Sequence, residues 1–183
     1  ALLAGCASAP PKGARASGAF PQGLSVCAGG VSNAPAADAS GRLAGFDQLI
    51  VVRGNMLARA PVEACLSSGY GPRRGAGGAG SFHHGLDLYT GAPKPVLAGG
   101  DGVIETAGQQ RDYGNIVVIR HGAGVETRYA HLSSFAPGLR KGARVSAGDV
   151  IGMTGRTGNA TAVHLHYEVR IDGRTLDPLT HGR

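Results

Sequence analysis

The sequence predicts a mainly β protein, a compact antiparallel sheet domain that follows a disordered N-terminal tail. Gly occupies 32 and Pro 10 of the 183 positions, too many for long amphipathic helices. Short apolar runs alternate with glycine-containing turns, a pattern typical of an all-β domain. No repeat of strand, helix and strand is visible, which disfavours a parallel sheet.

The first 45 residues have a composition that cannot bury a core. Ala, Gly, Pro or Ser fills 30 of these positions, and the segment contains one acidic residue, Asp38, and one aromatic, Phe20. Such composition is typical of a flexible linker. We therefore predict a tether over residues 1–45 and a folded domain over residues 46–183, with structure beginning near Phe46.

The N-terminus resembles an export signal. Residues 1–6, Ala-Leu-Leu-Ala-Gly-Cys, are similar to the end of a signal peptide that runs into the lipobox of bacterial lipoproteins, which would place a lipid anchor on Cys6. The alternatives are an ordinary signal with a cleavage site at residues 7–9 and a chance Ala-rich start. The first two interpretations both mean export.

The cysteines and the net charge limit the cross-links that the chain can form and the partners that it can bind. If Cys6 is lipidated or removed, Cys27 and Cys65 can form the one intrachain disulfide of an exported protein, or remain as two buried thiols. The formal net charge of +6 suits a polyanion such as a carboxylate-bearing cell wall, or serves solubility alone. No basic run with interleaved aromatics occurs, so we expect no nucleic-acid partner.

The strand candidates follow one another along the domain. Residues 56–65 form either a strand or a short helix. The expected strands cover residues 49–53, 86–89, 95–98, 101–106, 114–120, 125–131, 149–153 and 163–171.

The last of these strands carries a histidine pair. His164, His166, Glu168 and Arg170 share one face of the strand, and the apolar residues between them share the other. Two imidazoles at this spacing point the same way and can converge on one metal ion, although two surface histidines would give the same pattern. Glu168 would then support a ligand from behind, or be a solvated surface residue.

A second cluster lies at His83, His84 and Asp87. An extended strand would separate residues 83 and 87 by roughly 13 Å, so one ion can bind both only if the backbone bends, and Gly85 permits a bend. Spacing alone does not choose between His83 and His84, nor between His164 and His166. Two histidines and a carboxylate with an open fourth position are typical of catalytic zinc.

A further histidine, His131, ends the strand candidate at residues 125–131. On a regular strand, Thr127, Tyr129 and His131 share one face, and His131 is either a site residue or a surface histidine. The helical His-Glu-x-x-His motif and the Gly-x-Ser-x-Gly motif are both absent from the sequence.

Together these motifs resemble a known family. The ordered series His83-x-Gly85-x-Asp87, Tyr113-Gly114-Asn115, Tyr129-Ala130-His131-Leu132 and His164-Leu165-His166 is similar to the LytM/lysostaphin-type zinc peptidases, family M23. The similarity covers about residues 67–178. It implies a LytM-like fold for the domain. One departure is Val163, where many relatives have Pro.

The resemblance assigns roles residue by residue. It implies one Zn²⁺ ion bound by His83, Asp87 and His166, with His131 and His164 flanking the metal and its water. His84 falls at the variable position of its motif and is interpreted as non-ligating. Arg73, in Gly69-Tyr70-Gly71-Pro72-Arg73, and Asn115 are expected to contact substrate or to form turns.

The resemblance also implies an activity and a location. We expect an endopeptidase that cuts peptidoglycan stem peptides or cross-links, monomeric and exported to the periplasm or cell surface, with a lipid anchor to a membrane if Cys6 is modified. One alternative is a non-catalytic module that binds the wall or activates an amidase. Another is an endopeptidase silenced by its own N-terminal segment, with Asn33 or Asn55 at the fourth zinc position.

Overall fold

The computed structural model describes residues 19–29, 31–73 and 81–181. Cys6 and the lipobox-like residues lie outside these ranges, and so does the first part of the predicted tether. All regular elements of the described residues are strands, as the sequence predicts. No helix in these ranges is long and apolar enough to cross a membrane.

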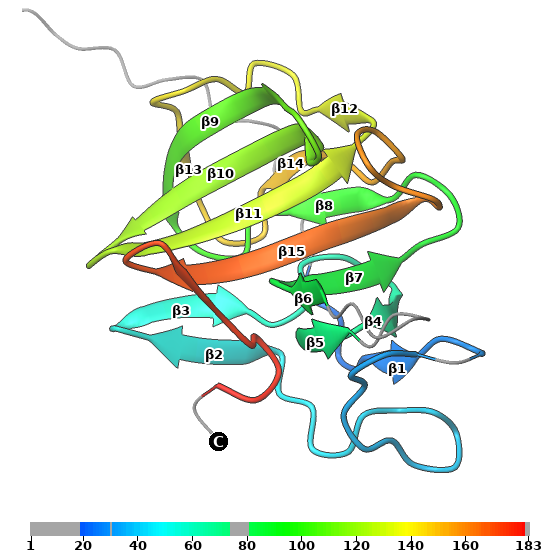
Figure 1. Cartoon of the computed structure of the whole chain (residues 1–183). Coiled ribbons are helices and arrows are strands. Elements are labelled where there is room, and N and C mark those ends of the chain that lie inside the picture. Colours follow the sequence, from blue (N-terminus) through cyan, green and yellow to red (C-terminus); the bar gives the residue numbers. More distant parts are fainter. Residues whose placement is uncertain (1–18, 30, 74–80, 182–183) are drawn as a thin grey trace, which may run out of the picture.

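One large sheet organises the described chain (Figure 1). Its nine strands run in the order β1-β4-β7-β15-β11-β10-β9-β13, with β16 paired to β15. All the pairs are antiparallel except β1 with β4. The strands are β1 (Ser25–Val26), β4 (Cys65–Ser68), β7 (Leu86–Tyr89), β9 (Gly102–Gln110), β10 (Gly114–Gly122), β11 (Val125–Leu132), β13 (Arg144–Val145), β15 (His164–Ile171) and β16 (Arg174–Leu176).

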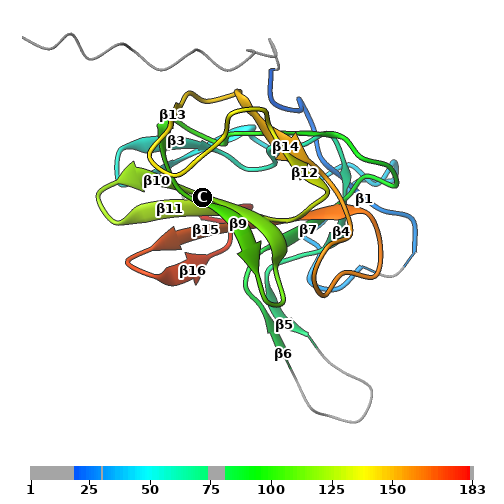
Figure 2. The same ribbon diagram turned by 90° about the horizontal axis from the view of Figure 1, so that it is seen from above.

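Three small antiparallel sheets complete the described part of the chain. They are β2 (Leu49–Val52) with β3 (Asn55–Ala58), β5 (Gly71–Arg73) with β6 (Ser81–His83), and β12 (Ser134–Phe135) with β14 (Val150–Met153) and β8 (Pro95–Leu97). The β5–β6 hairpin projects away from the large sheet (Figure 2).

The predicted strands are confirmed with shifts of a few residues at their ends. The segment over 56–65, for which strand and helix were both open, contributes to β3 and β4. The β2–β3 turn is tight because Arg53 and Gly54 both adopt positive φ, at 46° and 79°. Two such residues match the right-handed twist of a hairpin.

The main core lies where the large sheet meets the smaller ones. Tyr129 of β11 and Tyr167 of β15 are fully buried there, together with Leu57 of β3 and Ile151 of β14. The apolar residues of β15 thus face the core, as its alternation predicts. The opposite face of β15 is left for His164, His166 and Glu168.

The described part of the N-terminal segment is structured, which differs from the tether predicted for residues 1–45. Residues 19–45 are described apart from Gly30, and Leu24 and Leu43 among them are buried, so structure begins before Phe46. Leu24 is only 2% exposed, β1 pairs with β4, and a disulfide joins Cys27 to Cys65. The prediction from composition was wrong because it did not account for the disulfide. A cross-link between distant residues lowers the entropy of the unfolded chain, so a few apolar contacts are enough to hold the segment.

Leu24 provides a test of this packing. We expect Leu24→Ala to lower the free energy of unfolding by about 2–5 kcal/mol, because it removes buried methyl groups and leaves a cavity. Val51→Ala is the matched control, since Val51 is 66% exposed, and should cost less than about 1 kcal/mol. Urea denaturation followed by circular dichroism measures both. Equal midpoints for Leu24→Ala and the wild type would contradict the packing.

Candidate metal centre

His83 and Asp87 reach one point because the chain passes from one sheet to another between them. His83 ends β6 of the small hairpin, whereas Asp87 lies in β7 of the large sheet. Gly85 is required at the crossing, where a Cβ atom would collide with the backbone carbonyl oxygen of Tyr167. The absence of a side chain at Gly85 therefore lets the backbone between β6 and β7 lie close to β15. This is a second reason for glycine here, in addition to the bend expected from the sequence.

His166 completes the cluster through strand pairing. In the β7–β15 register, Asp87 lies directly opposite His166. Asp87 Oδ1 is 2.9 Å from His166 Nδ1 and 3.1 Å from His83 Nε2, and the two nitrogens are 3.2 Å apart. Ligands at 2.0–2.1 Å around a tetrahedral ion lie about 3.3 Å from one another, so the three atoms are spaced to hold a metal such as zinc.

In His83 and His166, the ring nitrogen that points away from the cluster, called the outer nitrogen, already makes a hydrogen bond. His83 Nδ1 lies 2.7 Å from the Gly69 carbonyl oxygen, and His166 Nε2 lies 3.0 Å from Glu168 Oε1. Both oxygens accept, so both outer nitrogens donate. His83 Nε2 and His166 Nδ1 are then left either to bind a metal through their lone pairs or, without one, to share a proton with Asp87. Three acceptors then face one another, an arrangement that needs a cation or a shared proton between them. Outer hydrogen bonds of this kind orient metal-binding histidines.

The pKa values of Asp87 and His166 are both shifted in the direction that favours positive charge in the cluster. Burial raises the pKa of the Asp87 carboxyl, but hydrogen bonds from His166 and His83 outweigh burial and hold that pKa well below its usual range. Burial lowers the pKa of His166, whereas hydrogen bonds to Asp87 and Glu168 raise it, to about 9 overall. The cluster therefore favours a cation at its centre.

Glu168 is a buried carboxylate behind the cluster. Its side chain is 0% exposed and accepts hydrogen bonds from His166, from Tyr113 Oη at 2.8 Å and from Arg170 Nε at 2.7 Å. Burial raises the pKa of Glu168, but the hydrogen bonds from His166 and Arg170 lower it to about 2. Of its two sequence interpretations, the solvated surface residue is wrong.

Arg73 and Ser68 hold the other side of the cluster. Arg73 Nη2 donates to Asp87 Oδ2 at 2.6 Å and to Ser68 Oγ at 2.9 Å, and Ser68 Oγ lies 3.3 Å from His83 Nδ1. The N-terminal segment supports this corner, because Gly69 donates its backbone N–H to the Ser32 carbonyl at 2.8 Å. No motif or spacing in the sequence pointed to Ser68.

His131 reaches the cluster through an irregularity in β11. The β10–β11 register pairs Val117 with Tyr129 but Asn115 with Leu132, so β11 contains one extra residue. His131 adopts a left-handed φ of 63° at this bulge. The shared face predicted for Tyr129 and His131 is therefore wrong: Tyr129 enters the core, while the His131 ring lies 5.9 Å from that of His166. Bulges re-aim side chains in this way.

His131 and His164 form a pair beside the cluster. Their ring centres are 4.8 Å apart, and each donates from Nδ1 to a backbone carbonyl, of Thr157 and Ala162 respectively, at 2.9 Å. Nε2 of each ring is left free of these bonds, and His164 Nε2 lies 3.6 Å from Asp87 Oδ1. Burial lowers the pKa of His131 to about 4, so its ring is neutral at pH 7.

A cleft of about 430 Å³ contains these groups. It is lined by residues from several elements, and among them are Arg73, His83, Asp87, Tyr113, His131, His164 and His166. One wall comes from Asn159, Ala160 and Thr161, which precede β15.

Other predicted residues lie elsewhere. Asn115 is not among the residues that line the cleft, and its amide donates to the Leu132 carbonyl at 3.0 Å, which holds β10 to β11. His84 points away from the cluster, toward Thr175. Neither Asn33 nor Asn55 lines the cleft: Asn33 packs on Gly69 and Gly71, and the Asn55 amide donates to the Val52 carbonyl.

Comparison with known proteins agrees with this geometry. Residues 81–178 match the model of peptidase family M23, and they include all three candidate ligands. The chain belongs to peptidase family M23. Its all-strand architecture agrees with the fold that the sequence resemblance implied.

Two curated relatives each match about half of this M23 chain. The DD-carboxypeptidase/endopeptidase Mpg of Neisseria meningitidis is 47% identical over 99 residues, which is 54% of this chain and 22% of the relative. The peptidoglycan DD-endopeptidase ShyA of Vibrio cholerae is 41% identical over 97 residues, which is 53% of this chain and 22% of the relative. The match thus spans about a fifth of the length of these proteins.

A solved structure extends the similarity to the fold of the M23 domain. A zinc-containing peptidase from Vibrio cholerae aligns with 75% of this chain and 47% of its own chain, with 30% sequence identity and a TM-score of 0.61. The donor set of this chain, two imidazoles and a carboxylate, is one that zinc accepts.

Gly85 tests the close approach to β15. We expect Gly85→Ala to lower the free energy of unfolding by about 1–3 kcal/mol, because the added methyl group must displace backbone. Gly108→Ala is the matched control, since a Cβ there meets nothing within 4 Å, and should leave stability unchanged or raise it by up to about 1 kcal/mol. Thermal unfolding of both variants measures the difference; equal effects would refute the requirement.

Glu168 tests the support of His166. We expect Glu168→Gln to weaken binding of Zn²⁺ by about 10–100-fold, because the amide no longer holds the outer N–H of His166 with a full negative charge. Competition with a chromophoric chelator measures the affinity. Glu126→Gln, on the neighbouring strand, is the control. Unchanged affinity in Glu168→Gln, with the fold intact by circular dichroism, would contradict this role.

Proposed function

We propose that this domain is a zinc-dependent endopeptidase that hydrolyses peptide bonds of peptidoglycan, in stem peptides or cross-links. The observation that carries the proposal is the set of three acceptor atoms, on two buried histidines and the partly buried Asp87, within 3.2 Å of one another, with two further imidazoles at their side. The relative ShyA is named a peptidoglycan DD-endopeptidase, and this name supports the choice of substrate.

His83, Asp87 and His166 would bind one zinc ion. Zinc at such a site supplies Lewis acidity, which polarises the scissile carbonyl and brings the pKa of a water close to 7. The protein's own part is to keep two imidazole lone pairs and one carboxylate oxygen aimed at one point. Gly69, Glu168 and Arg73 do so by holding the outer atoms of the three ligands.

His131 and His164 would carry the proton. Each is fixed by its Nδ1–H bond to a backbone carbonyl, which leaves Nε2 free to accept or return a proton. One of the two takes the proton of the attacking water, and the other stabilises the tetrahedral oxyanion or protonates the leaving amine. Apart from the candidate ligand Asp87, the described residues that line this cleft include one carboxylate, Asp112. His131 and His164 contact the cluster itself, which favours imidazole as the base.

Arg73 would meet the substrate at the mouth of the cleft. Its side chain is 38% exposed while one guanidinium nitrogen holds Asp87, so its remaining surface can bind a carboxylate or carbonyl of the peptide. The net charge of +6 favours approach to a carboxylate-bearing wall. Such a substrate places the domain outside the cytoplasm, in the periplasm or at the cell surface, and a lipid on Cys6 would keep it near a membrane.

Two substitutions separate metal binding from proton transfer. We expect His166→Ala to lose both the zinc and the hydrolysis of purified peptidoglycan. His131→Asn should retain one zinc per chain but lower kcat by about 10²–10⁴-fold. Asn is chosen because it tolerates the left-handed φ of this position. Metal analysis and chromatography of released wall fragments provide the readouts.

The same measurements address the alternative. A folded wild type that binds no zinc and releases no fragments would overturn the peptidase proposal and favour a non-catalytic module that binds the wall or activates an amidase. Retained hydrolysis in His166→Ala would overturn the ligand assignment.

A further inference from the structure

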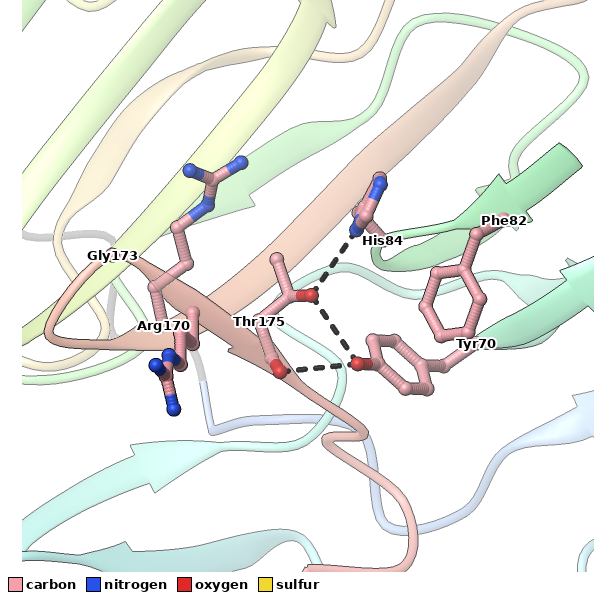
Figure 3. Close-up of a pocket in the computed structure, with 7 residues that line it drawn as sticks. Tyr70, Phe82, His84, Arg170, Gly173 and Thr175 are labelled. Atoms are coloured by element: carbon pink, nitrogen blue, oxygen red, sulfur yellow. Dashed lines mark hydrogen bonds between the residues drawn. The ribbon is translucent and has the colours of Figure 1, made fainter.

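A second cavity lies on the other side of the β5–β6 hairpin from the metal cluster. Its volume is about 510 Å³, and its lining includes Tyr70, Phe82, His84, Arg170, Arg174 and Thr175 (Figure 3). Side chains alternate along a strand, so Phe82 and His84 point to the face of the hairpin opposite to His83. The hairpin therefore separates two binding surfaces.

One wall of this cavity is aromatic and already ordered. The Phe82 ring lies 5.1 Å from the Tyr70 ring in an edge-to-face arrangement and 5.1 Å from the His84 ring. Tyr70 donates to the Thr175 carbonyl at 3.0 Å, and His84 Nδ1 lies 3.2 Å from Thr175 Oγ1. Although it is fixed by these neighbours, Phe82 remains 47% exposed. A preformed apolar surface lowers the entropy cost of binding.

The opposite wall is cationic. Arg170 is paired with Glu168 and Glu126. Arg174 is exposed and its backbone pairs with Ile171, but its guanidinium makes no hydrogen bond or ion pair with another of the described residues. No Asp or Glu occurs among the described residues that line the cavity. An anionic ligand would therefore meet an uncompensated positive charge beside an exposed aromatic ring.

We propose that this cavity is an accessory site for the glycan strand of peptidoglycan, an inference that rests on the proposed substrate class. The apolar C–H face of a sugar ring fits against Phe82, the free carboxylate of a sugar that bears no stem peptide pairs with Arg174, and ring hydroxyls meet His84 and Thr175. Val51 and Met56 form another exposed apolar pair, across the β2–β3 hairpin. Without a neighbouring cationic side chain that is free to pair among the described residues, they do not combine apolar surface and positive charge as the cavity does.

This assignment gives the two faces of the hairpin different tasks. The face that carries Arg73 and His83 meets the peptide to be cut, and the face that carries Phe82 holds the polymer to which that peptide is attached. An accessory contact on the same hairpin raises the local concentration of peptide at the cluster without any change in the cluster itself.

The test compares binding with cleavage. Binding to purified peptidoglycan sacculi is measured by co-sedimentation in the zinc-loaded His131→Asn background, so that the polymer stays intact. We expect Arg174→Glu to bind about fivefold more weakly, the loss of one ion pair. Arg144→Glu, the same change on exposed β13, should bind like its parent. Phe82→Ala should also weaken binding, and Met56→Ala should not.

Two further measurements locate the effect. Carboxylate-bearing glycan strands freed of peptide should displace the protein from sacculi and lose this ability with Arg174→Glu. In the otherwise wild-type chain, Arg174→Glu should hydrolyse a short soluble cross-linked peptide at the parent's rate and retain one zinc. Equal binding of Arg174→Glu and Arg144→Glu, displacement by free peptide alone, or loss of zinc in Arg174→Glu would each overturn the accessory site.

Failure of the proposed function has a different signature. A zinc-loaded wild type that does not cleave the short peptide, but whose binding to sacculi still depends on Arg174, would contradict the peptidase and leave the glycan site standing.

Discussion

Pairing between β7 and β15 is the constraint on which the metal cluster depends. It sets Asp87 opposite His166, and the pairing of β7 with β4 places Ser68 on the other side of Asp87. A slip of one residue would turn every side chain of β7 to the other face, which would bury Asp87 in the core and expose Leu86 and Leu88. The apolar core and the metal cluster therefore require the same register.

Each ligand of the cluster is held from behind by a different part of the chain. Gly69 holds His83, Arg73 holds Asp87, and Glu168 holds His166. Burying Glu168 is tolerated because Tyr113 and Arg170 satisfy its oxygens as well; a charge without such partners would be costly. The disulfide-linked N-terminal segment reaches this arrangement through Ser32 and Gly69, so residues outside the matched 81–178 also support the site.

The sequence predicts the strands well because apolar alternation and glycine turns are local signals. The candidate ligands came from spacing together with family resemblance, since alternation alone did not choose between His83 and His84 or between His164 and His166. Three features escaped prediction for physical reasons. The packing of residues 19–45 depends on a distant cross-link, the burial of Glu168 depends on strand neighbours, and the face of His131 depends on an extra residue that leaves no compositional trace.

The bulge in β11 means that the site depends on the number of residues in two paired strands as well as on the types of its side chains. Between Tyr129 and Leu132, one residue more than the partner strand requires brings an imidazole out of the core and beside the metal ligands. An insertion of one residue in β10 between Asn115 and Val117 would restore a regular ladder and place His131 with Tyr129 on the core side. It would remove the proposed proton carrier from the cleft while every site residue stayed the same. A relative with that insertion would keep all five residue types and retain the motif without the arrangement.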